Sequence, residues 1–136
     1  MPVFLDSNVF LYAAGGDHPL RAPCRRILVR LADGTLEATT STEVVQELIH
    51  VLGRRGLRDE ALRLATSVLD LVPDMLPVRP EDIRRSVAVM REVPDLPARD
   101  ALHVATMRGA RIDTIVSADR HFDLVDKIRR TDPSSA

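Results

Sequence analysis

Four acidic side chains stand where their types and spacing could bring them together for chemistry. Asp6 and Asp119 each follow an apolar run that fits a buried strand. Glu47 and Asp100 lie in segments of helical periodicity, each with apolar side chains one turn away. Each acid alone has an ordinary explanation, such as capping a helix or occupying a turn. Together, however, the four carboxylates could converge in one cleft.

Carboxylates that share a cleft support a specific kind of chemistry. Their mutual repulsion raises the pKa of at least one of them unless a divalent cation neutralises the group. Ligation by oxygen alone suits Mg²⁺ or Mn²⁺ rather than zinc, and such sites catalyse phosphoryl transfer with a metal-activated water. Glu47 has no Lys or Arg three or four residues away with which it could pair. The pattern therefore predicts an acidic metal site.

Strands and helices alternate along the chain, which predicts an α/β fold with a parallel sheet covered by helices. Functional sites of such folds form beyond the carboxyl ends of the strands, where Asp6 and Asp119 are expected. The expected strands are residues 2–5, 36–40, 75–78, 113–117 and a last one from 128, and the expected helices are 8–14, 19–32, 42–54, 59–72, one from 80, and 98–108.

Length and composition limit the classes of protein that fit. The 136 residues, 45% apolar and 29% charged, predict one globular domain over residues 1–132 and a loose tail over 133–136. The net charge of -1 argues against bulk electrostatic binding of nucleic acid but allows a local basic groove. Cys24 is the only cysteine, and neither a signal peptide nor a membrane-spanning run is visible. We therefore expect a soluble, cytoplasmic protein.

The segments around the four acids resemble, in order, those of PIN-domain ribonucleases, and in particular of VapC-type toxins. The resemblance implies a three-layer α/β/α sandwich with a central, mainly parallel sheet. It also implies an endoribonuclease that uses Mg²⁺ or Mn²⁺, a VapB-type antitoxin as partner, and a homodimer. The matching segments are residues 3–12, 42–48, 99–105 and 117–123.

The resemblance also implies roles for individual residues. Asp6 and Asp100 would be direct metal ligands. Glu47 and Asp119 would bind metal directly or through water, or would orient the attacking water. Three further side chains are expected to assist: Asn8 and Ser117 by fixing the orientation of a carboxylate, and Asp123 as an auxiliary acid.

Outside the four acids, the sequence offers candidate residues for RNA binding and one histidine close to an acid. Arg99 and Arg120 adjoin two of the acids in sequence and are candidates for substrate binding. His103 lies three residues after Asp100, which favours a hydrogen bond or an ion pair on the same helix over catalysis. Aromatic residues make up only 3%, too few for an extended base-stacking sheet, so specificity is expected from RNA shape.

Two other classes of protein share parts of this pattern. A haloacid-dehalogenase-like phosphatase would need a second Asp two residues after the first, where this chain has Asn8, and a Lys, of which only Lys127 is present. The other alternative is a non-catalytic PIN-like module whose acidic cleft binds the Arg side chain of a partner protein. Turnover that depends on metal would distinguish the enzyme from the module.

Overall fold

A computed structural model describes residues 1–136 as a four-stranded parallel sheet with six α-helices around it. The strand order is β2-β1-β3-β4. The strands are β1 (Val3–Leu5), β2 (Ala38–Thr39), β3 (Thr114–Val116) and β4 (Arg129–Thr131). The helices are α1 (Ser7–Ala14), α2 (Arg21–Ala32), α3 (Thr42–Arg54), α4 (Arg58–Leu71), α5 (Pro80–Glu92) and α6 (Ala98–Gly109), with two 3₁₀ turns, η1 (Arg120–Leu124) and η2 (Pro133–Ser135).

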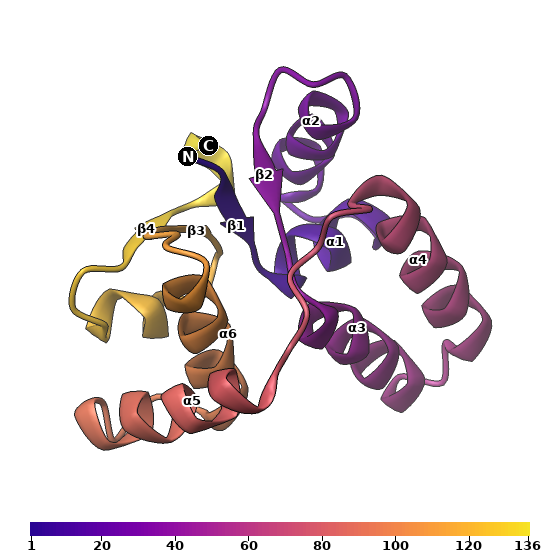
Figure 1. Ribbon diagram of the computed structural model, residues 1–136. Coiled ribbons are helices and arrows are strands. Elements are labelled where there is room, and N and C mark those ends of the chain that lie inside the picture. Colours follow the sequence, from indigo (N-terminus) through magenta and orange to yellow (C-terminus); the bar gives the residue numbers. More distant parts are fainter.

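The helices pack in consecutive pairs. α1 contacts α2, α3 contacts α4, and α5 contacts α6. The α5–α6 pair and the α1–α2 pair lie on opposite sides of the strands, α3 lies beside α1, and α4 packs on α3 (Figure 1). The predicted α/β class and its layered α/β/α arrangement are confirmed, and the sheet is parallel throughout.

The central strands are buried because their side chains are apolar on both faces. Phe4 and Ile115, neighbours across β1 and β3, are both fully buried, and Phe10 of α1 and Phe122 of η1 join the same core. Burial of large apolar side chains of this kind is the dominant favourable term in folding. The core therefore fixes β1, β3 and α1 relative to one another.

Side-chain caps begin the two helices that leave the carboxyl edge of the sheet. Asp6 follows β1 and accepts a hydrogen bond from the backbone N–H of Ser7, so α1 begins at once. Ser41 follows β2 and accepts from the N–H of Val44, so α3 begins at Thr42 as the sequence predicts. Both helices therefore start beside the ends of neighbouring strands.

Two segments differ from the sequence-based expectation. Residues 75–78 form no strand and make only one bridge, between Leu76 and Ser41. Prolines at 73 and 77 flank this bridge and have no N–H to extend a ladder. The final residues, expected as a loose tail, form η2, in which Pro133 is buried and which contacts α2. None of the helices combines the length and apolar character needed to span a bilayer.

Candidate active site

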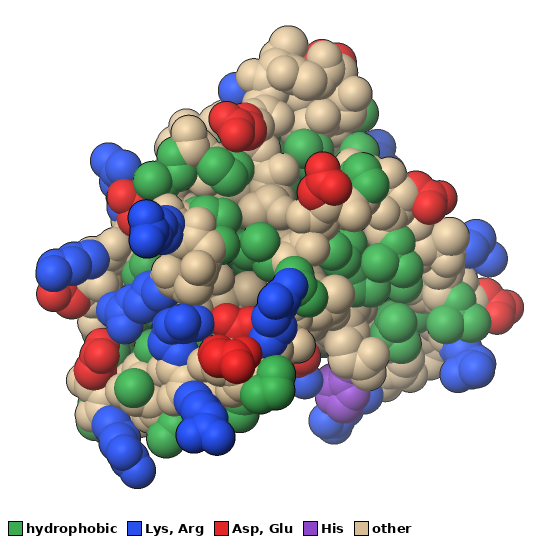
Figure 2. Space-filling model, viewed as in Figure 1, with side chains coloured by type: hydrophobic (Ala, Val, Ile, Leu, Met, Phe, Trp, Pro, Cys, Tyr) green, Lys and Arg blue, Asp and Glu red, His purple; other side chains and the backbone are tan.

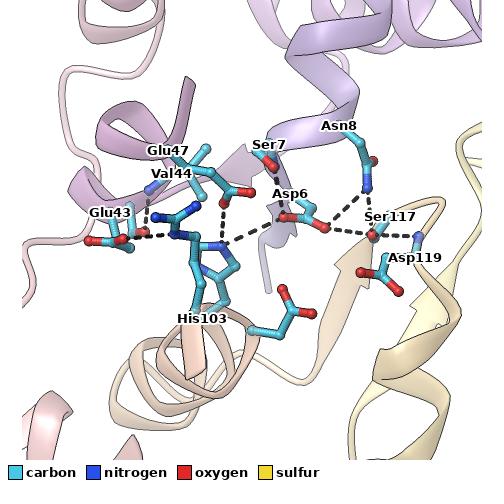
Figure 3. Close-up of polar contacts among 12 residues, drawn as sticks. Asp6, Ser7, Asn8, Glu43, Val44, Glu47, His103, Ser117 and Asp119 are labelled. Atoms are coloured by element: carbon cyan, nitrogen blue, oxygen red, sulfur yellow. Dashed lines mark hydrogen bonds and ion pairs between the residues drawn. The ribbon is translucent and has the colours of Figure 1, made fainter. Parts of the chain in front are cut away.

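The four predicted acids meet at the carboxyl edge of the sheet. Asp6 comes from the junction of β1 and α1, Glu47 from α3, and Asp119 from the segment after β3 (Figure 3). Asp100 lies in the first turn of α6. Charge repulsion between Asp6 and Asp100, and between Asp100 and Asp119, contributes to the electrostatics of the group. The structure thus brings all four carboxylates into one cluster, which we call the acidic cluster.

Asp6 is the most buried and the most firmly held of the four, with an exposed fraction of 3%. One carboxylate oxygen, Oδ1, accepts from the N–H of Ser7 over 2.8 Å. The other, Oδ2, accepts from the Ser117 hydroxyl over 2.6 Å and from the Asn8 amide over 3.2 Å. The structure therefore places Asn8 and Ser117 where they can orient the Asp6 carboxylate.

Asn8 and Ser117 also tie α1 to the segment after β3. The Asn8 amide donates to the Ser117 hydroxyl oxygen over 3.0 Å, and its Oδ1 accepts from the N–H of Ala118. The Ser117 oxygen in turn accepts from the N–H of Asp119. These bonds fix Asp119 relative to Asp6 through a chain of polar contacts, drawn in Figure 3.

His103 lies inside the cluster, although the sequence indicated only a local contact with Asp100. Its Nε2 lies 3.0 Å from Glu47 Oε1 and 3.7 Å from Asp6 Oδ1, and the side chain is fully buried. The imidazole therefore bridges α6 to α3 rather than bonding along its own helix. Its position one turn after Asp100 was the one sequence signal that could have placed it here.

His121 is a second histidine that sequence reasoning missed. Its Nδ1 lies 2.8 Å from Asp119 Oδ1 and 3.7 Å from Asp100 Oδ2. Two groups of three potential ligands result, one of Asp6, Glu47 and His103 and one of Asp100, Asp119 and His121. In each group the ligand atoms lie within 4.8 Å of one another.

The pKa values of two carboxyls in the cluster are raised. Burial raises the pKa of Asp6, and the opposing effect of His103 does not cancel it. Burial, followed by the charges of Asp6 and Asp119, raises the pKa of Asp100 to about 7. Metal-free protein at neutral pH therefore carries a carboxylate whose ionised form is disfavoured.

Glu47 and His103 behave as a pair. Burial favours the neutral Glu47, but the hydrogen bond and charge of His103, together with Ser7 and Arg99, outweigh it and lower the pKa of Glu47. For His103 burial favours the neutral ring, yet the hydrogen bond to Glu47 and the charges of Glu47 and Asp6 raise its pKa. Glu47 is thus held in its ionised form.

The donor set fits a hard divalent cation. Asp6 and Asp100 present carboxylate oxygens whose charge is not balanced by Lys or Arg, because the ion pairs of both involve only histidine. Oxygen-rich sites of this kind favour Mg²⁺ or Mn²⁺. Such an ion would remove the repulsion that raises the pKa of Asp100.

The remaining predicted residues lie at the margin. Asp123 accepts from the Arg130 guanidinium over 2.9 and 3.3 Å, so its carboxylate is already neutralised. Arg99 pairs with Glu43 over 3.3 Å. Arg120 is exposed and makes no ion pair. Of the two candidate arginines, only Arg120 is free to meet an anion without losing a partner.

A separate charged pocket lies where α5 begins, away from the acidic cluster. It has a volume of about 320 Å³ and is lined in part by Arg79, Glu81, Asp82 and Arg85. Acidic and basic side chains gather together over α5 and α6 on the face shown in Figure 2. Arg85 pairs with Asp82 over 3.0 Å, and Asp82 also accepts from the N–H of Arg79 at the start of α5. Asp82 is therefore engaged both in an ion pair and in capping α5.

The fold and the acidic cluster together define an α/β/α domain with a carboxylate-rich centre at the carboxyl edge of its sheet. A model of one family, the PIN domain, matches residues 3–128. The chain belongs to the PIN domain family.

The relatives of the chain are consistent with this family. It is 36% identical over 128 residues to Ribonuclease VapC7 of Mycobacterium tuberculosis, covering 93% of this chain and 88% of that protein. It is 34% identical to Ribonuclease VapC23 of the same species over 86% of this chain and 92% of that protein. VapBC2 from Rickettsia felis bound to a DNA fragment from their promoter shares the fold at a TM-score of 0.76 and 14% identity, covering 97% and 98% of the two chains. Mycobacterium tuberculosis VapC20, a sarcin-ricin loop cleaving toxin, gives a TM-score of 0.72 at 17% identity over 87% and 90%.

Proposed function

We propose that the protein is a Mg²⁺- or Mn²⁺-dependent endoribonuclease that acts as the toxin of a toxin–antitoxin pair. The observation that carries this proposal is the convergence of all four acids in a chain 36% identical to a VapC ribonuclease over nearly its whole length. An inactivated relative would be expected to have lost at least one of these carboxylates.

The four acids of the acidic cluster would have different roles in the reaction. Asp6 and Asp100 would hold the cation, which when bound supplies an activated water and neutralises charge on the phosphate. Glu47, kept ionised by His103, can accept a hydrogen bond from the attacking water. The backbone N–H of Asp119 donates to the Ser117 hydroxyl oxygen, and Ser117 in turn donates to Asp6. Asp119 can therefore orient either the water or a ligand of the ion.

Apolar surfaces outside the cluster support protein partners. Residues of α1 and α2, among them Phe10, Leu28 and Val29, line an apolar groove of about 410 Å³. Such a groove fits the apolar face of a peptide segment, and we propose a VapB-type antitoxin as its occupant. Over α4, where Figure 2 shows hydrophobic side chains, Leu62 and Leu69 are 43% and 48% exposed. This surface supports a homodimer.

We propose that the enzyme works on cytoplasmic RNA. The first experiment therefore measures cleavage of total RNA by purified, antitoxin-free protein in Mg²⁺, in Mn²⁺ and in EDTA. Asp6→Asn keeps the size and the helix cap but removes the charge, and it should abolish cutting. Asp70→Asn changes an exposed acid of α4 remote from the cluster and serves as the matched control. Cutting that survives EDTA or Asp6→Asn would point to a contaminant, and no cutting at all would favour the non-catalytic binding module.

A further inference from the structure

A second pocket opens beside the acidic cluster, between α1, the loop that follows it and the end of α3. Its volume is about 340 Å³, and Asn8, Tyr12, Asp17, His18 and Arg55 are among its lining residues. Asn8 belongs to both sites, because its amide also donates to Asp6. Tyr12 follows Asn8 by four residues on α1, so it lies on the same face about 6 Å further along the helix. A strand bound at the cluster could therefore extend into this pocket.

The pocket contains a preformed aromatic surface. The rings of Tyr12 and His18 are stacked, with centroids 4.3 Å apart and planes inclined by 23°. The N–H of Leu20 donates to His18 Nδ1 over 3.0 Å, which fixes the orientation of the imidazole. His18 is exposed and Tyr12 half-buried, so the pair combines an anchored ring with an accessible one. Another flat ring could join this stack at little entropic cost.

The polar side chains of the pocket suit a nucleotide. Arg55 lies at the C-terminal end of α3, is exposed and makes no ion pair, so its guanidinium is available to a phosphate or to a ring. Asp17 makes no ion pair either, and its carboxylate can accept hydrogen bonds from the amino groups of a base. Stacked rings, a free guanidinium and a free carboxylate in one pocket are the features by which proteins bind unstacked bases.

We infer that this pocket binds one nucleobase of the RNA strand next to the phosphate held at the acidic cluster. The base stacks on the Tyr12–His18 pair, and Arg55 contacts the adjoining backbone. This inference rests on the proposed ribonuclease function and names a substrate contact for it. It also refines the expectation drawn from the scarcity of aromatic residues, because a single pair of rings suffices for one base.

The chain provides a direct probe of this pocket, since Tyr12 is its only tyrosine. Its ring signals in proton NMR can be followed in EDTA, without cleavage, during titration with a mixed-sequence hexaribonucleotide and with ribose 5-phosphate. We expect the RNA to shift these signals saturably and the sugar phosphate to leave them unchanged. His18→Ala and Arg55→Ala should each weaken binding at least about fivefold, whereas Arg91→Ala, an exposed arginine on α5, should not.

Several results would overturn the inference. They are the absence of a saturable shift with RNA, equal shifts with ribose 5-phosphate, and unchanged RNA affinity in both variants. If His18→Ala and Arg55→Ala bind a co-purified antitoxin more weakly but bind RNA as well as wild type does, the pocket belongs to a protein partner. Cleavage assays of the wild type and of both variants separate the two proposals. If wild type does not cut RNA, the ribonuclease function fails. If His18→Ala and Arg55→Ala cut as fast as wild type and at the same positions, the ribonuclease function stands and the base pocket is refuted.

Discussion

Replacing Asp100 by Asn should stabilise the metal-free protein while it abolishes cleavage. The pKa of Asp100 rises from 3.8 to about 7 on folding, chiefly because the carboxyl is buried and then because Asp6 and Asp119 repel its charge. Folding therefore disfavours the ionised form. Asn keeps the size of the side chain and has no charge to lose.

The magnitude and sign of this effect follow from proton linkage. A rise of about 3 pKa units corresponds to at most about 4 kcal/mol at 1.36 kcal/mol per unit. Because the side chain of Asp100 is still 14% exposed and water screens part of the repulsion, we expect a gain of about 1–2 kcal/mol, or about 4–8 °C in Tm. The destabilisation is absent below about pH 4, where both states bind the proton, grows as the pH rises from 3.8 towards 7, and is then constant.

The assay is thermal or denaturant unfolding in EDTA at a series of pH values between 4 and 8. Asp100→Asn should exceed wild type in stability at pH 8, and the difference should shrink steadily as the pH falls towards 4. Asp70→Asn should show no such trend. Addition of Mg²⁺ should stabilise the wild type more than the variant, because the ion removes a repulsion that the variant lacks. A variant that is less stable than wild type at pH 8, or a gain that does not depend on pH, would refute the reasoning.

Three further substitutions test other parts of the site and the core. Ser117→Ala removes the 2.6 Å hydrogen bond to Asp6, and it should reduce the rate of RNA cleavage about 10- to 100-fold while the circular dichroism spectrum stays native. His103→Leu removes the hydrogen bond between His103 and Glu47, so it should lower the free energy of unfolding by about 1–3 kcal/mol. It should also slow RNA cleavage. A variant as stable as wild type would mean that the bond is dispensable. Phe122→Ala opens a cavity in the core and should cost about 3–5 kcal/mol in denaturant unfolding; a much smaller loss would show that η1 packs loosely.

The positions of the acids could be predicted from the sequence because local patterns place them. Asp6 and Asp119 follow apolar strands, and parallel strands bring their carboxyl ends to one edge. Glu47 and Asp100 lie beside apolar side chains on their helices, so packing of those helices turns them inward. The prediction of a strand at residues 75–78 was wrong, because an apolar pattern indicates burial but not hydrogen-bond pairing with a neighbouring strand.

The two histidines could not be predicted in this way. His103 bonds to Glu47 across 56 positions of sequence, and that choice depends on how α6 packs against α3. His121 reaches Asp119 and Asp100 only because η1 turns back towards the first turn of α6. Contacts of this kind are settled by tertiary packing, for which periodicity carries no information. The same is true of the stacked rings of Tyr12 and His18.

Asp6 and Asp100 should differ in how their mutation inactivates such a toxin under selection. Under the proposed function Asp6 is a metal ligand, and it also accepts the hydrogen bond that begins α1, whereas Asp100 opposes folding when it is ionised. Among spontaneous mutants that escape toxicity, changes at Asp100 should accumulate as intact, folded protein that still binds its antitoxin. Changes at Asp6 other than to Asn should instead be recovered mainly as protein that is degraded.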